Sequence, residues 1–369
     1  MDRGPQRRPL CAHLSPALPR LPAGLRQRGG GGSPAADFCP VGGLCLFFRV
    51  LYRLLKSYAR FAIHLFCRHI DVLPRGLLQA KGPLLLAANH PNSFLDGIIL
   101  TILLDRPLYS LARGDAFAHP ALRRIMKPFH LLPVYRTSEG VENLQHNYGT
   151  FTACQDVFRK GGIVLIFSEG GCVNEWHLRP LRKGTARLAI SSWQQGIPLT
   201  VLPLGFNYNR FRNFGKNVFI RCGAPIDAAA VLQEESDGKQ LLQFNSQLRE
   251  GLEGLVYEID PHDTATLKRL VAVPHPLAKR LLLAPLAGLG ALLHAPLYFP
   301  LKAVTQARFN NDHFDSVLVA LLLILYPLYL LICFGIALIW LPALAALSVF
   351  VLLPGCAWAT VQLKDQLAK

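Results

Sequence analysis

The sequence predicts an α/β domain, with a central sheet flanked by helices, that carries membrane-associated helices at both ends. Three observations support this fold class. Short β-rich segments alternate with helical segments between about residues 75 and 227, a pattern typical of α/β domains. Of the 369 residues, 51% are hydrophobic and only 17% are charged. Finally, residues 316–363 contain no Asp, Glu, Lys or Arg, a run long enough for two membrane helices.

The charge balance points to a membrane surface. The chain has 39 Lys and Arg against 23 Asp and Glu, a formal net charge of +16. A chain that is both basic and apolar fits anionic lipid better than nucleic acid, and this composition excludes a disordered, highly charged tail protein. The nine Cys form no Cys-x-x-Cys pair, and their odd number favours reduced thiols in a protein that faces the cytoplasm.

The first 72 residues divide into two parts. Residues 1–40 are rich in Pro and Gly, and we expect them to be disordered. Residues 41–72 predict an amphipathic, membrane-associated helix, because Arg49, Arg53, Lys56 and Arg60 follow at helical spacing beside aliphatic and aromatic residues. The alternative is a helix packed on its own domain, with this basic stripe in solvent.

Residues 75–260 are expected to form the α/β domain. The predicted strands are 83–88, 108–112, 131–135, 163–168, 199–206 and 218–222, and the predicted helices between them are 94–104, 120–127, 141–159 and 184–195.

The remaining chain is expected to contact the membrane. Residues 261–315 form a connector whose apolar part, broken by three prolines, is membrane-associated or re-entrant. Residues 316–363 predict two transmembrane helices with a turn near Leu341 and Pro342. Two spans would return Lys364 and Lys369 to the side of the α/β domain, which the positive-inside rule places in the cytoplasm. A hairpin buried in a soluble core is the alternative.

The segment Asn89-His90-Pro91-Asn92-Ser93-Phe94-Leu95-Asp96 follows a predicted strand and opens a predicted helix. If Asp96 reaches Nδ1–H of His90, it fixes the imidazole tautomer and stabilises the imidazolium, so that Nε2 can take a proton from a hydroxyl. The alternative is a surface His beside an Asp that the helix dipole favours.

A second group of polar residues follows the strand predicted at 163–168. Glu169 and Gly170 come directly after it, and the cations Arg179, Arg182 and Lys183 are close in sequence. Arg136 follows another predicted strand. Cations at the carboxyl ends of strands suit an anionic, hydroxylated substrate, although each could also be a solvated surface charge.

These segments resemble the glycerolipid acyltransferase family, which includes 1-acylglycerol-3-phosphate acyltransferases. The resemblance covers about residues 75–225 and rests on four blocks in the family order: His90–Asp96, Arg113–Arg136, Phe167–Gly184 and Val201–Leu204. It implies acyl transfer from acyl-CoA or acyl carrier protein to a glycerolipid hydroxyl. His90 would be the general base, Asp96 its partner, Arg136 a phosphate contact, and Glu169 with Gly170 part of the acceptor site, with the fourth block on the acyl-donor side.

Two blocks depart from the family pattern. Five residues separate His90 from Asp96, where the family usually has four, so Asp96 needs a longer loop to reach the imidazole. Ser168 replaces the usual Pro, and Gly171-Cys172-Val173 replaces Thr-Arg-Ser. Because the third block lacks this Arg, the identity of the acceptor stays open. Arg179, Arg182 or Lys183 could supply the missing positive charge.

We therefore expect a membrane-bound acyltransferase that acylates a lysophosphatidic acid-like glycerolipid in phospholipid synthesis, with its catalytic domain facing the cytoplasm. The alternatives are another acceptor, such as glycerol 3-phosphate, another lysophospholipid or an amino lipid, or a non-catalytic lipid-binding protein. We expect no metal, no nucleic acid partner and no cofactor beyond the acyl donor. No Gly-x-Ser-x-Gly motif occurs, and a nucleophilic role for Cys172 is disfavoured because nothing in the sequence marks a lowered thiol pKa.

Overall fold

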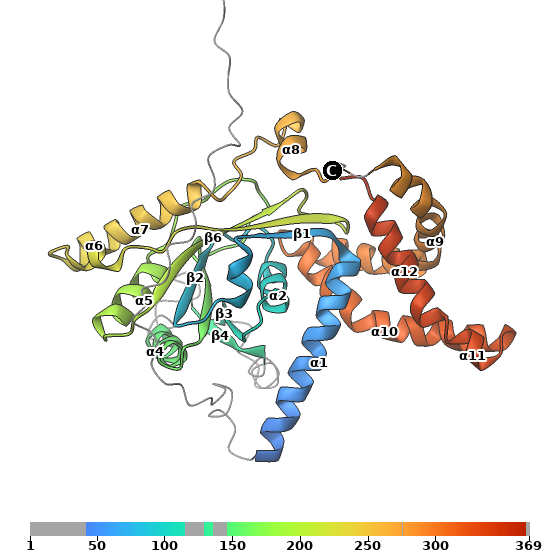
Figure 1. Ribbon diagram of the computed structural model, residues 1–369, viewed down its shortest axis with the longest axis horizontal. Coiled ribbons are helices and arrows are strands. Elements are labelled where there is room, and N and C mark those ends of the chain that lie inside the picture. Colours follow the sequence, from blue (N-terminus) through green and yellow to red (C-terminus); the bar gives the residue numbers. More distant parts are fainter. Residues whose placement is uncertain (1–41, 115–128, 136–145, 275, 367–369) are drawn as a thin grey trace, which may run out of the picture.

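The computed structural model describes residues 42–114, 129–135, 146–274 and 276–366 (Figure 1). The segment 1–40, the helix expected at 120–127, the first residues of the helix expected at 141–159, and Arg136 lie outside the described residues. Within them, the fold is a seven-stranded sheet flanked by helices, with long apolar helices in the C-terminal region. The predicted fold class is confirmed.

The sheet is mixed, with the strand order β1-β7-β6-β2-β5-β3-β4. Neighbouring strands are parallel except β6 and β7, so β7 and β1 run against the other five. The strands are β1 (Cys67–Leu73), β2 (Leu84–Ala88), β3 (Leu108–Arg113), β4 (Leu131–Val134), β5 (Ile163–Phe167), β6 (Thr200–Tyr208) and β7 (Lys216–Cys222). The prediction of a helix through residue 72 is wrong at its end, because residues 67–73 pair with β7 as an edge strand.

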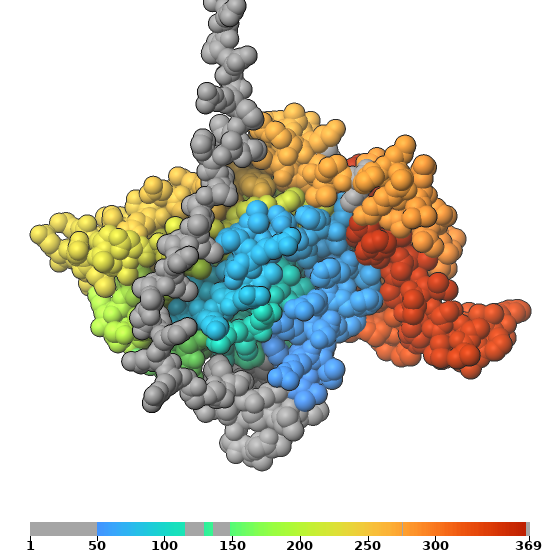
Figure 2. All heavy atoms as spheres, in the orientation of Figure 1, coloured from blue at the N-terminus to red at the C-terminus, as the bar shows by residue number. Residues whose placement is uncertain are grey.

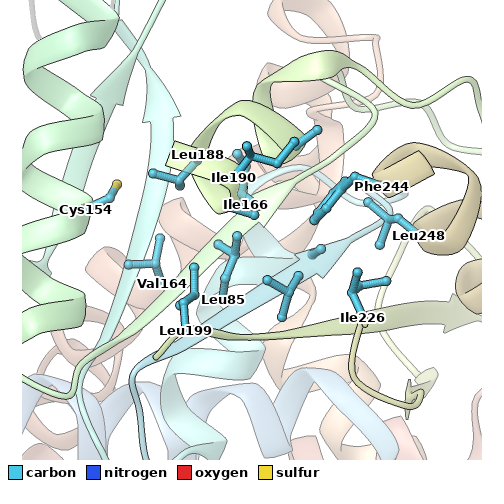
Figure 3. Close-up of a cluster of buried hydrophobic side chains, with 14 of the residues drawn as sticks. Leu85, Cys154, Val164, Ile166, Leu188, Ile190, Leu199, Ile226, Phe244 and Leu248 are labelled. Atoms are coloured by element: carbon cyan, nitrogen blue, oxygen red, sulfur yellow. The ribbon is translucent and has the colours of Figure 1, made fainter. Parts of the chain in front are cut away.

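Helices cover both faces of the sheet. Side chains of the central strands alternate between the two faces, so each face has apolar side chains to bury. Leu85 and Ala87 of β2 join a buried cluster with α4 (His146–Arg159), α5 (Lys183–Gln194) and α7 (Asp237–Glu253), part of which Figure 3 shows. Leu84 and Leu86 point to the other face and pack with α1 (Gly42–Phe66) and α2 (Phe94–Leu103). The shorter elements are η3 (Arg75–Gln79), α6 (Ala228–Leu232) and α8 (Thr264–Val271).

Helix α1 directs part of its basic stripe into the protein. The Lys56 ammonium donates to the carbonyl of Leu104 at 2.6 Å, and Arg60 Nε donates to the carbonyl of Ile102 at 2.9 Å. Both carbonyls lie at the C-terminal end of α2, where cations stabilise unpaired carbonyls and the helix dipole. The contacts of these two cations favour the alternative interpretation, in which the helix packs on its own domain. The apolar side chains of Leu54 and Phe61, by contrast, are exposed.

Among the described residues, three helical segments are long and apolar enough to cross a membrane: Leu277–Arg308, Phe314–Trp340 and Ala343–Leu363. They comprise α9 (Leu277–Arg308), α10 (Phe314–Trp340), and α11 (Ala343–Ala346) with α12 (Val349–Leu363). The sequence had predicted two such helices. The difference is α9, which continues through Pro285, Pro296 and Pro300 where a broken segment was expected.

Helix α9 contacts the α/β domain at both of its ends. Before it begins, the amide of Val273 donates to Gln366 Oε1, which also accepts from the side chain of Asn217 in β7. After it ends, Asn310 accepts from Arg212 in the β6–β7 loop at 2.7 Å. Helices α10 and α12 leave the domain and project from it with α11 at their far end (Figures 1 and 2).

Candidate active site

The site is built from loops that follow neighbouring strands. His90 follows the central strand β2, Glu169 follows β5, and β6 ends at Tyr208. Because these three strands are parallel, their carboxyl ends meet at one edge of the sheet, where ligands of open α/β sheets bind. Asn89 fixes this edge, since its side chain accepts from the amide of Phe206 at 2.7 Å and donates to the Phe206 carbonyl at 3.1 Å.

The structure brings His90 and Asp96 together. Nδ1 of His90 lies 2.9 Å from Oδ2 of Asp96, although five residues separate them in sequence. Ser93, which lies between them, adopts a positive φ of 52° directly before α2, a conformation uncommon for a residue with a side chain. Asp96 then lies in the first turn of α2.

The carboxylate of Asp96 is fully buried and accepts hydrogen bonds on both oxygens. The amide of Asn92 donates to Oδ2 at 2.9 Å, beside His90, and the Tyr208 hydroxyl donates to Oδ1 at 2.5 Å. Burial, reinforced by the charge of Asp96, raises the pKa of Tyr208 well above its usual value, so the phenol keeps its proton. These contacts hold the carboxylate in the orientation that pairs it with the imidazole.

Two further contacts position His90. Its ring stacks on Phe167 at the end of β5, with 3.6 Å between ring centroids and 13° between ring planes, and its amide donates to Glu169 Oε2 at 2.8 Å. The imidazole side chain is 14% exposed. Because Nδ1 contacts Asp96, Nε2 is the nitrogen left to accept a proton from a substrate.

Glu169 joins the two loops that flank the site. Besides the amide of His90, its carboxylate accepts the amide of Arg179 at 3.0 Å. Glu169 is buried, and this desolvation raises its pKa, although the two N–H bonds act in the opposite direction. Gly170 turns the chain after it with φ +67°, and a Cβ at this position would lie 2.8 Å from Cγ of Arg182. A larger residue would therefore strain the turn and collide with Arg182.

The three described candidate cations lie beside this turn. Arg179 contacts Glu175, with 3.4 Å between Nε and Oε1. Arg182 and Lys183 are exposed where α5 begins, and the Arg182 amide donates to the Ser168 carbonyl at 2.7 Å. Arg136 lies outside the described residues.

The thiol of Cys172 lies within the site without the features of a nucleophile. It accepts a hydrogen bond from the amide of Ser93 at 2.9 Å. Burial and the nearby charge of Asp96 raise its pKa far above the usual value, so the reactive thiolate is suppressed. Within the described parts of the chain, no group of three or more His, Cys, Asp or Glu could hold a metal ion.

Residues just before and within α10 also hold the His90 loop. Ser316 accepts from the amide of Leu95 at 3.1 Å and donates to the carbonyl of Asn92 at 3.0 Å. Nδ1 of His313 lies 2.7 Å from the Ser93 hydroxyl. Sequence reasoning missed these contacts and Tyr208. Tyr208 follows the fourth block closely, but no local pattern links residues 313 and 316 to a loop more than 200 positions earlier.

Comparison with known proteins defines the class to which this site belongs. Residues 66–207 match the family model described as Acyltransferase. This match lies within the α/β domain and confirms the resemblance seen in the sequence.

A solved structure similar to this chain is the 1-acyl-sn-glycerophosphate acyltransferase PlsC from Thermotoga maritima. It shares 13% sequence identity and a TM-score of 0.40, over 59% of this chain and 84% of that chain. No curated protein sequence matches the chain significantly.

Proposed function

We propose that the chain is a membrane-bound O-acyltransferase that moves a fatty acyl group from acyl-CoA or acyl carrier protein to the hydroxyl of a lysophosphatidic acid-like glycerolipid. The observation that carries this proposal is the His90–Asp96 pair, at 2.9 Å, inside the region that matches the acyltransferase family. A buried carboxylate oriented on Nδ1 is the arrangement that makes Nε2 of an imidazole a general base.

The proposed reaction is a direct transfer. Nε2 of His90 accepts the proton of the acceptor hydroxyl while the hydroxyl oxygen attacks the thioester carbonyl carbon. The carbon–sulfur bond then breaks, and the departing thiolate accepts the proton from the imidazolium, so the enzyme ends unchanged. Asp96 stabilises the transient imidazolium, and the stacked ring of Phe167 holds the imidazole in place.

An anionic acceptor is favoured by the charge around the site. Arg179, Arg182 and Lys183 lie in the segment that follows Glu169, and Arg136 lies in the second block of the resemblance. A phosphate held by these cations would place a glycerol hydroxyl near the edge of the sheet on which His90 lies. Glycerol 3-phosphate carries the same phosphate chemistry and is the second acceptor to be tested.

Membrane attachment is favoured by exposed apolar surface. Leu331, Ile339 and Trp340 of α10 and Leu344 of α11 are more than half exposed, as is Leu54 of α1. Exposed apolar side chains on long apolar helices are typical of contact with lipid. We further propose that the α/β domain lies on the cytoplasmic side, because Lys364 follows α12 beside that domain.

The test measures the acyl-transfer rate of the full-length protein in detergent micelles. The rate is monitored as release of free thiol from acyl-CoA, with lysophosphatidic acid as acceptor. We expect His90→Ala to lower the rate by ~10²–10⁴, and Asp96→Asn to lower chiefly kcat. His177→Ala is the matched control, because His177 pairs with Glu258 at 2.6 Å on the exposed surface.

An intact His90→Ala protein that keeps more than a tenth of the wild-type rate would refute the assigned base. A wild-type protein that releases no thiol with lysophosphatidic acid, glycerol 3-phosphate, another lysophospholipid or an amino lipid would refute the enzyme and favour a lipid-binding role. A preference for a neutral acceptor would refute the role of the cations.

A further inference from the structure

A cavity between the apolar helices and the α/β domain lies away from His90. It has a volume of about 670 Å³ and lies between α1, α9, α10, α12 and the β6–β7 loop. Its walls are mostly apolar, with Ala62 of α1, Ala295 of α9, Leu323 of α10 and Ala357 of α12 among them. None of its described lining residues belongs to the segments 90–96 or 167–184. The cavity is therefore separate from the candidate active site.

One end of this cavity is cationic. Arg210, Lys302 and Lys364 line it, together with the single carboxylate of Asp365. Arg210 is only 6% exposed, and its Nε has no hydrogen-bond partner among the described residues. A buried guanidinium N–H without a partner is costly, and an oxygen of a bound ligand would satisfy it, while Nη2 of Arg210 already donates to the carbonyl of Asp365.

The electrostatics also indicate a shortage of negative charge. Arg68 lies beside this end, because it donates to the carbonyl of Lys364, and its Nη1 is buried without a partner. Burial and the charge of Arg210 lower the pKa of Arg68 to about 10. Burial together with the charges of Arg210 and Lys302 lowers the pKa of Lys364. An anion placed among these cations would relieve their mutual repulsion.

The polar and apolar ends are arranged along the helices as a lipid requires. Lys364 directly follows α12 and Lys302 lies near the end of α9, both beside the α/β domain, whereas Ala357 and Tyr326 lie further along their helices, away from the domain. Ala291 and Phe299 of α9 line the cavity and are themselves exposed. This part of the lining therefore lies on an apolar helix that reaches the surface.

We propose that this cavity binds an anionic phospholipid of the bilayer, with its phosphate held by Arg210, Lys302 and Lys364 and an acyl chain between α1, α9, α10 and α12. This site goes beyond the proposed function, since it lies apart from the acceptor site and takes part in no bond change. A lipid bound here stabilises the packing of the apolar helices against the α/β domain, because it contacts both.

The test uses full-length protein freed of lipid in a neutral detergent. Phosphatidylglycerol, phosphatidylcholine or inorganic phosphate is titrated, and both the thermal unfolding temperature and the bound mass by native mass spectrometry are measured. We expect phosphatidylglycerol to bind one molecule per chain and to raise the unfolding temperature, with phosphatidylcholine at least tenfold weaker. Equal effects of the two lipids, or an equal effect of inorganic phosphate alone, would overturn the proposal.

Two pairs of variants separate headgroup from chain. Lys302→Gln should weaken phosphatidylglycerol binding at least fivefold, whereas Arg308→Gln, an exposed cation on the same helix outside the lining, should not. Ala295→Phe should fill the apolar part and abolish the bound mass, whereas Ala303→Phe, outside the lining, should not. Wild-type binding in either the Lys302→Gln or the Ala295→Phe protein would overturn the site.

Discussion

The hydroxyl of Tyr208, at the end of β6, donates a hydrogen bond of 2.5 Å to the Asp96 oxygen that does not contact His90. Asp96 is thus held from both sides, by a phenol on one oxygen and by the imidazole and the Asn92 amide on the other. Tyr208 touches neither substrate nor reacting atoms in the proposed reaction. It is a positioning residue for the carboxylate.

Replacing Tyr208 by Phe removes this donor without changing the shape of the ring. Hydrogen bonds to charged groups contribute about 1.5–3 kcal/mol, so we expect the free energy of unfolding to fall by about that amount. We also expect kcat to fall while the acceptor KM changes little, because the base is misaligned but the substrate contacts remain. Denaturant unfolding and steady-state kinetics in micelles measure these quantities. Tyr148→Phe, at a position 77% exposed, is the control, and an unchanged kcat in Tyr208→Phe would contradict the role.

Glu169 should make stability depend on pH in a defined direction. Its pKa in the folded protein is raised above the usual 4.5, chiefly by burial, so the folded state holds this proton more tightly than the unfolded state. The contribution of Glu169 to the free energy of unfolding is therefore largest below about pH 4.5, and it falls as the pH rises through the pKa of Glu169 in the folded protein. Thermal unfolding of wild type and Glu169→Gln across this range should show wild type losing stability relative to the variant as pH rises. A constant difference would contradict the raised pKa.

Cys172 should be dispensable for the chemistry. Its thiol is held neutral by burial and by the charge of Asp96, and only a thiolate attacks a thioester effectively. We expect Cys172→Ala to keep at least a third of the wild-type transfer rate, with the remaining loss due to the missing acceptor for the Ser93 amide. Trapping of an acyl group on Cys172, detected by mass spectrometry of the protein after brief exposure to acyl-CoA, would instead establish a covalent route.

Lys216 of β7 and Asp315 of α10 form an ion pair in which both side chains are fully buried. Removing one partner leaves an isolated buried charge, so Lys216→Met should lower the free energy of unfolding by about 3–5 kcal/mol. The double variant Lys216→Met, Asp315→Leu should lose less than the sum of the two single losses, because no charge remains unpaired. Denaturant unfolding of all four proteins gives the coupling free energy. Simple additivity would show that the pair does not join α10 to the sheet.

The sequence was sufficient for features set by local patterns. The strands predicted at 83–88, 163–168 and 218–222 lie within two residues of β2, β5 and β7 at each end, because each is a short apolar run with clear ends. The contact between His90 and Asp96 was also predictable, since only five residues separate them, in the loop and the first turn of the helix that follows it.

The sequence was insufficient where a contact depends on distant partners. Residues 67–73 continue a helical pattern but pair with β7, about 150 positions later, and tertiary pairing overrides local preference. Likewise, the side chains of Lys56 and Arg60 turn toward the protein because they bind carbonyls at the end of α2. The spacing of these cations in the sequence does not reveal that contact. Prolines in α9 predicted a break, yet the helix continues through them.

The way residues 361–366 close the fold has a consequence for the order of synthesis. Arg68 at the start of β1 donates to the carbonyls of Val361 and Lys364, and Gln366 bonds to both Asn217 and Val273. The ribosome makes all of the sheet, α9, α10 and most of α12 before it makes these partners. While the chain grows, the β1–β7 edge therefore carries unpaired polar groups, and the apolar helices emerge before the edge can be sealed. If α9–α12 enter the lipid as proposed, their insertion should precede completion of the domain.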